Sequence, residues 1–315
     1  MSLQSLKTPV PSVVGAFVRP NTSLGGAGCS MESQRAPPLS RASSVQPSAL
    51  APALSADFLH AASCSKVQAD IGIVMDTTGS MRGWLNQAKD TVWPVANAVQ
   101  LQLQAMKPRA EVAVRAAVVS YKDFGDAGHL QKQDFTLEGS EIVKLLEKVS
   151  ATGGGDTCED VAGALAAAEA LNWQSSNRVV VHFLDAPPHG RQYHDLGARG
   201  DHHTDVGPGL SETLRKLALN RISYTLVQCV KPGDSSLNKY VREGERVYAS
   251  AIDELRQIPG PLPKFTPLKI DHSNHRDFYE VLLTSTMRSV AGAVPLASRV
   301  FDAAHASGMA VIAKA

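Results

Sequence analysis

Short runs of β-branched and apolar residues alternate along the chain with longer segments whose apolar positions recur every three or four residues. The apolar runs are typical of buried strands, and they cover 67–75, 111–120, 178–184 and 222–230. A more polar run at 133–137 predicts an edge strand.

The segments between these strands predict helices at 81–106, 140–149, 159–171, 210–219 and 277–290. Pro94 should bend the first of them. Parallel neighbours in a sheet need crossover connections of about this length. We therefore predict an α/β fold in which a doubly wound, mostly parallel sheet carries helices on both faces.

Polar side chains gather where the predicted strands end. Asp76, Thr78 and Ser80 follow the first strand, and Asp185 follows the strand at 178–184. The glycines at 153–155 allow a tight loop that delivers Asp156, or Thr157 with a shift of one residue, to the same edge. Ligands of such sheets bind beyond the carboxyl ends of the strands.

Carboxylate and hydroxyl oxygens in this arrangement suit Mg²⁺, with Mn²⁺ and Ca²⁺ as alternatives. Any one of the aspartates could instead cap the helix that follows it. The three segments together favour a metal site, and its predicted ligands are Asp76, Thr78, Ser80, Asp156 and Asp185.

Three motifs resemble the metal-ion-dependent adhesion site of von Willebrand factor A domains: Asp-x-Thr-Gly-Ser-Met at 76–81, Gly-Gly-Gly-Asp-x-x-Glu-Asp at 153–160 and Leu-Asp-Ala-Pro-Pro-His-Gly at 184–190. The pattern is most similar to the subtype found in hemicentins and beside alpha-kinases. The resemblance spans 67–291 and implies six strands, with one antiparallel strand at an edge. It also implies a non-catalytic protein-protein interaction module.

By this resemblance, Thr78 and Ser80 bind the cation through their hydroxyls, and Asp76 and Asp185 hold it directly or through water. The adhesive members leave one position open for an acidic side chain of a protein partner. Asp156 departs from the pattern, because the best-known members have Thr there. A third carboxylate should tighten metal binding and make the ion a poorer acceptor for an acidic partner.

The two ends of the chain differ in composition from its middle, and the overall composition gives no support to nucleic-acid or membrane partners. Residues 1–66 are rich in Ser, Pro and Ala and predict a disordered region, with an organelle transit segment as the alternative. Residues 292–315 predict an Ala-rich tail. A net charge of +1 gives no support to nucleic-acid binding, and no apolar run is long enough to span a membrane.

The scattered cysteines favour an intracellular, cytoplasmic protein over a secreted one.

The sequence also leaves two functions open besides an interaction module. The histidines and aspartates of 189–205 fit no standard zinc spacing, which predicts a solvated loop beside the metal. A regulatory component of an alpha-kinase system is one alternative to an interaction module. A metal-assisted hydrolase that uses this loop is the other.

Overall fold

A single six-stranded sheet organises the part of the chain that the computed structural model describes, which is residues 66–197, 199–203 and 208–291. The strand order is β3-β2-β1-β4-β5-β6. The parallel strands are β1 (Lys66–Asp76), β2 (Glu111–Tyr121), β4 (Asn177–Leu184), β5 (Ile222–Val230) and β6 (Phe265–Asp271). Strand β3 (Leu130–Thr136) runs antiparallel to β2 at one edge. The predicted mostly parallel sheet is confirmed.

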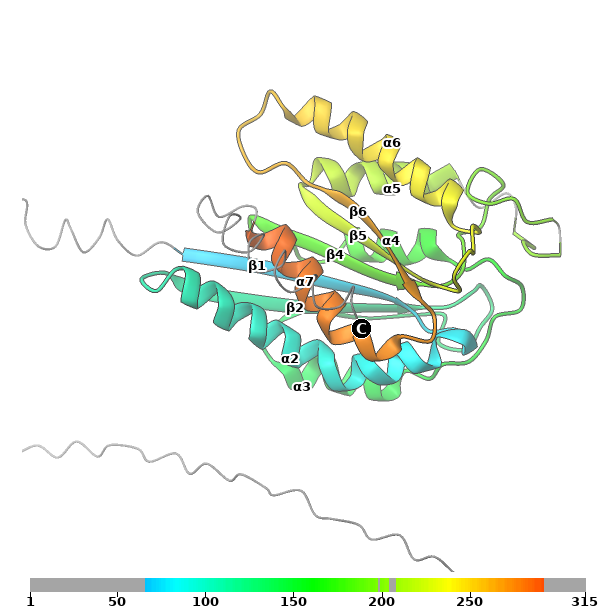
Figure 1. Ribbon diagram of the computed structural model, residues 1–315, viewed down its shortest axis with the longest axis horizontal. Helices are drawn as coiled ribbons and strands as arrows, with labels where there is room; N and C mark the ends of the chain where they lie inside the picture. The colour runs from blue at the N-terminus through cyan, green and yellow to red at the C-terminus, as the bar shows by residue number, and fades with distance from the viewer. Residues whose placement is uncertain (1–65, 198, 204–207, 292–315) are drawn as a thin grey trace, which may run out of the picture. The chain divides into compact units, whose positions relative to one another are not determined.

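Helices cover both faces of this sheet (Figure 1). One face packs against α2 (Arg82–Met106), α3 (Gly139–Lys148) and α7 (Phe278–Ala291). The short turns η1 (Gly79–Met81) and η2 (His275–Asp277) precede α2 and α7. The other face packs against α4 (Val161–Glu169), α5 (Pro208–Leu219) and α6 (Asn238–Leu255). The fold is therefore doubly wound, as predicted.

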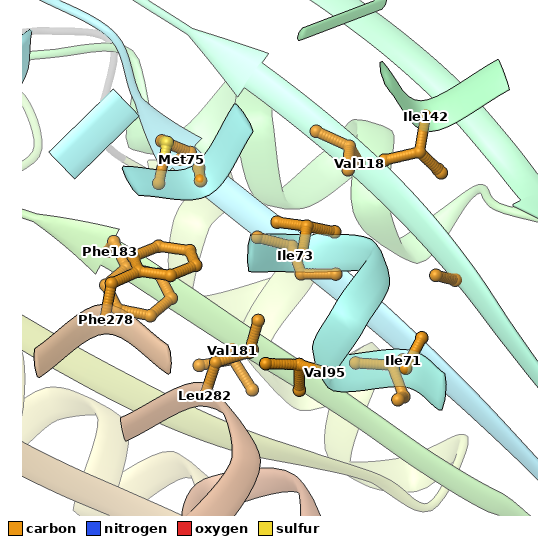
Figure 2. Close-up of a cluster of buried hydrophobic side chains, with 14 of the residues drawn as sticks. Ile71, Ile73, Met75, Val95, Val118, Ile142, Val181, Phe183, Phe278 and Leu282 are labelled. Carbon is orange, nitrogen blue, oxygen red and sulfur yellow. The ribbon is translucent and has the colours of Figure 1, made fainter. Parts of the chain in front are cut away.

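The two hydrophobic cores follow from the alternation of side chains along each strand. On β1, Ile71, Ile73 and Met75 face α2 and α7, whereas Val74 belongs to the opposite core. Figure 2 shows the first core, where the rings of Phe183 and Phe278 stack with centroids 4.5 Å apart. This stack joins β4 to α7.

A chain of buried hydrogen bonds crosses the second core. His182 Nε2 lies 2.8 Å from the Tyr121 hydroxyl, and its Nδ1 lies 2.7 Å from the Tyr224 hydroxyl. The Tyr224 hydroxyl in turn lies 2.8 Å from that of Tyr240 on α6. Burial lowers the pKa of His182 from 6.5 to about 3, so the imidazole stays neutral and bridges β2 and β5.

Two elements were not predicted from the hydrophobic pattern. Helix α6 is rich in charged residues, and its buried positions are spread among them. Strand β6 contains Pro267, which is tolerated because an edge strand has one side without ladder partners. Gly244 lets α6 approach this strand, since a Cβ atom there would lie 2.5 Å from the Phe265 ring.

The predicted disordered region at 1–66 and the predicted tail at 292–315 lie outside the described residues, except that Lys66 begins β1.

We expect Phe183→Ala to lower the free energy of unfolding by about 3–5 kcal/mol, because it leaves a cavity between β4 and α7. Urea denaturation of the full chain measures this change. Leu101→Ala is the matched control, because Leu101 is 71% exposed on α2 and its loss should change stability by less than about 0.5 kcal/mol. Equal effects of the two substitutions would contradict the described packing.

Candidate functional site

Asp76 ends β1 in a turn that its own carboxylate stabilises. Its Oδ1 accepts hydrogen bonds from the Thr78 backbone N–H at 2.8 Å and the Thr78 hydroxyl at 2.7 Å. Thr77 fastens the turn to β2 by donating its hydroxyl and its backbone N–H to the Tyr121 carbonyl. The Asp76 side chain is fully buried, and its Oδ2 has no hydrogen-bond partner among the described residues.

Asp185 follows β4 and lies at the same level of the sheet, because β1 and β4 are neighbours and Met75 pairs with Phe183. Its Oδ2 lies 3.4 Å from His272 Nε2, and the Ser80 side chain is hydrogen-bonded to the carboxylate. The Asp185 Oδ1 is buried and finds no partner in the described part of the chain. The sheet thus brings the first and third predicted motifs together.

Glu159 is the acidic residue of this site that the sequence analysis missed. The predicted helix began at residue 159, but α4 begins at Val161, with Asp160 as its N-cap. The Glu159 backbone N–H donates to the Pro187 carbonyl at 3.1 Å, which places this residue beside the loop after β4. Its Oε2 is a third buried carboxylate oxygen without a partner in the described residues. The Glu in Gly-Gly-Gly-Asp-x-x-Glu-Asp was the available signal.

The turn after β1, the glycine loop and the start of the loop after β4 border one cavity of about 320 Å³. Its walls are formed by Thr78, Gly79, Ser80, Gly153, Gly154, Asp156, Thr157, Glu159, Asp185 and Ala186. Four of the five predicted ligands therefore line a common space, and the fifth, Asp76, is hydrogen-bonded to Thr78 on its wall.

The carboxylate of Asp156 is held by the loops beside it. Its Oδ1 accepts from the Cys158 N–H at 3.0 Å, and its Oδ2 accepts from the His202 N–H at 2.6 Å. Both oxygens thus accept hydrogen bonds, whereas Asp76, Glu159 and Asp185 each have one buried oxygen without a partner in the described chain. Thr157, the alternative, is exposed and lines the cavity.

Burial raises the pKa of all three carboxyl groups in this site. Burial and the charge of Asp185 raise the pKa of Asp76 from 3.8 to about 7. Burial and the charge of Asp76, followed by smaller effects of other aspartates, raise the pKa of Glu159 from 4.5 to about 10. Burial also raises the pKa of Asp185, although Ser80 and His272 oppose the shift. No Lys or Arg of the described ranges makes an ion pair with these three groups.

The histidine loop after β4 differs from the predicted solvated loop. His189, His194 and Asp201 are at most 4% exposed, so that prediction is wrong for these residues. The side chain of Asp195 is 81% exposed, as predicted, and Asp205 lies outside the described residues. Ligand atoms gather here in two sets, Asp123, Asp156 and His189, and Cys158, His189 and Asp201.

No protein-family model matches the chain. The chain is 30% identical over 129 residues to alpha-protein kinase vwkA of Dictyostelium discoideum, a match that covers 40% of this chain and 20% of the kinase. It is 27% identical over 120 residues to an ariadne-like RING finger protein of Acanthamoeba polyphaga mimivirus, which covers 38% of this chain and 11% of that protein. The chain therefore spans a fifth or less of the length of these curated relatives.

Similar solved structures include a von Willebrand factor type A protein from Catenulispora acidiphila, 15% identical with a TM-score of 0.41 over 70% of this chain and 43% of that chain. Another is the VWA domain of SpRpn10, 12% identical with a TM-score of 0.38 over 67% and 93%. The described chain has the six-stranded, mostly parallel sheet with helices on both faces that the motif resemblance implies. None of its described helices is long and apolar enough to cross a bilayer.

We expect the metal-free chain to lose stability as pH rises from about 4 to about 7. The pKa of Asp76 is about 7 in the folded chain against an ordinary 3.8, so the folded state binds a proton that the unfolded state has released across this window. The contribution of Asp76 to stability is fully present below pH 3.8 and is lost as the pH rises toward about 7.

The measurement is urea denaturation in EDTA at a series of pH values. Asp76→Asn should flatten the decline, whereas Asp90→Asn, which removes the same charge from an exposed position on α2, should preserve it. If the free energy of unfolding of the two variants depended on pH in the same way, burial of the Asp76 carboxyl group would be refuted as the cause of the decline.

Proposed function

We propose that this chain is a von Willebrand factor A-type domain that acts as a non-catalytic protein-interaction module and binds a divalent cation, Mg²⁺ by preference, in the cavity at the carboxyl edge of the sheet. One observation carries the proposal: Asp76, Glu159 and Asp185 each have a buried carboxylate oxygen without a partner in the described chain. A cation would compensate these charges, since buried carboxylates are ordinarily paired, hydrogen-bonded or bound to metal. The donors fit a hard ion, because they are carboxylates and hydroxyls.

The proposed ligands are Asp76, Thr78, Ser80 and Asp185, with Glu159 as the third carboxylate. Glu159 is preferred to Asp156 for this role because its buried Oε2 has no partner in the described chain. Asp156 would then stand at the rim of the cavity. A bound cation would supply positive charge and a coordination position for a partner.

Three carboxylates around a divalent ion leave a net negative charge. Such a site attracts an acidic side chain less than one with two carboxylates does. We therefore propose that the partner presents a neutral or basic group at the cavity. This differs from the acidic side chain that adhesive members of the family accept.

The two curated relatives are named for different activities. One is named a kinase and the other a RING finger protein, and this chain covers only a minor part of each. The kinase match favours a second candidate function, a regulatory component of an alpha-kinase system. The predicted intracellular location stays a prediction.

We expect Mg²⁺ to raise the free energy of unfolding of the full chain, by about 2.7 kcal/mol at a concentration of 100 times its Kd. The Asp76→Asn variant should lose this response and show no saturable Mg²⁺ uptake by calorimetry. Asp90→Asn should bind as the unaltered chain does. Mg²⁺ uptake by Asp76→Asn equal to that of the control would refute the site.

The interaction role is tested by affinity capture with the full chain as bait. Proteins retained in Mg²⁺ should be released by EDTA and should not bind Asp76→Asn, because the cation completes the docking surface. Asp90→Asn serves as the matched bait. Capture that is indifferent to both EDTA and Asp76→Asn would contradict the proposal. An alpha-kinase among the released proteins would favour the second candidate function.

A further inference from the structure

A second group of metal-ligating side chains lies beside the proposed Mg²⁺ cavity. His189 Nε2 is 2.7 Å from Asp123 Oδ1, and a carboxylate oxygen of Asp156 completes a set whose ligand atoms all lie within 4.8 Å of one another. Asp123 belongs to the loop between β2 and β3, Asp156 to the segment before α4, and His189 to the loop after β4. Three connections far apart in sequence therefore meet at one imidazole.

Asp201 fixes the orientation of that imidazole. Its Oδ1 lies 2.9 Å from His189 Nδ1, and its Oδ2 accepts the Gly190 N–H at 3.0 Å. His194 Nε2 lies 2.9 Å from the same Oδ2. Asp201 therefore anchors the Nδ1 edge of the His189 ring, with Nδ1 as the donor in the tautomer that leaves Nε2 able to ligate.

This arrangement leaves His189 Nε2 facing the carboxylate of Asp123. An imidazole lone pair and a carboxylate oxygen 2.7 Å apart repel each other unless a proton or a metal ion lies between them. The Phe124 ring stacks on His189 with centroids 5.4 Å apart and holds the ring in this orientation. A ligating histidine whose other nitrogen donates to a carboxylate is the usual arrangement at protein metal sites.

The charge of the cluster also calls for a cation. Within the described ranges, Asp123, Asp156 and Asp201 have only histidines as partners at ion-pair distance. Both Asp123 and Asp201 are at most 5% exposed. These three carboxylates share His189, His194 and His202, so the cluster keeps negative charge whenever any one of the three imidazoles is neutral, and burying that charge is costly.

We propose that His189 Nε2, Asp123 and Asp156 form a site for a zinc-type transition-metal ion, with Asp201 as the positioning residue. Mixed imidazole and carboxylate donors suit Zn²⁺, whereas the neighbouring cavity offers only oxygen. Asp156 also lines that cavity, which gives the ion a path from solvent. The inference goes beyond the proposed interaction role and does not depend on Mg²⁺ binding.

The test uses Co²⁺ as a coloured substitute for Zn²⁺ on the full chain with the Asp76→Asn substitution. Excess Mg²⁺ is present, so that any site made of oxygen alone is disabled or filled. We expect one equivalent of Co²⁺ to bind with visible absorption that Zn²⁺ abolishes. Adding His189→Gln should remove the absorption and weaken binding by more than about 10-fold.

His194→Gln is the matched control, because His194 is also buried and bonded to Asp201 but lies outside the ligand set. It should keep the Co²⁺ absorption. Absence of Co²⁺ uptake, or absorption unchanged by His189→Gln, would overturn the proposal. A failure of Mg²⁺ to bind the unaltered chain would leave this result intact, so the two proposals fail separately.

A second measurement needs no change at His189 and so does not depend on how that variant folds. X-ray absorption at the zinc edge of the Zn²⁺-loaded Asp76→Asn chain should show imidazole and oxygen ligands at about 2.0–2.2 Å. A sulfur ligand at about 2.3 Å would assign the ion to Cys158 and overturn the proposed set. A Zn²⁺ coordination shell without imidazole would overturn the proposed ligand set as well.

Discussion

Buried carboxylates at the carboxyl edge of the sheet are the main electrostatic constraint of this structure, because no lysine or arginine of the described chain pairs with them. Asp76 is fully buried, and Asp185 and Glu159 each keep one buried oxygen without a partner. Such charge is costly in a folded protein unless a cation or a proton compensates it. The raised pKa values of all three groups express that cost. The proposed cation would compensate this charge and complete the proposed binding surface.

The parallel sheet makes this concentration of charge possible. Because β1 and β4 are neighbours and run in the same direction, the chain leaves both strands at one edge and delivers Asp76 and Asp185 together. The two hydrophobic cores hold the strands in place, and the Thr77 hydrogen bonds to Tyr121 hold the turn. The packing of apolar side chains thus supports an arrangement of charges that would otherwise separate.

The connections beyond this edge divide into two sites of different chemistry. The turn after β1 and the start of the loop after β4 offer only oxygen donors. The later part of that loop adds an imidazole, His189, which is fixed between Asp123 and Asp201. Asp156 lies at the boundary, since it lines the cavity and also belongs to the histidine cluster. Two ions of different hardness could therefore be held side by side, and a partner would meet both.

The sequence by itself determined the elements with a clear hydrophobic period and the motifs at their ends. Strands β1, β2, β4 and β5 and the Asp76 turn follow from local pattern, because buried parallel strands are nearly continuous apolar runs. Helix α6 and strand β6 did not follow, since a highly charged helix and a proline-containing edge strand owe their burial to neighbours distant in sequence.

Only the tertiary structure decided the roles of Glu159, Asp156 and the histidine loop. Glu159 faces the cavity because α4 begins two residues later than its pattern suggests, and His189 is buried because loops from three connections close over it. Residue types and their spacing show which metal-ligand atoms the sequence supplies. Which of them share a buried space depends on contacts between segments far apart in sequence, and no local pattern carries that information.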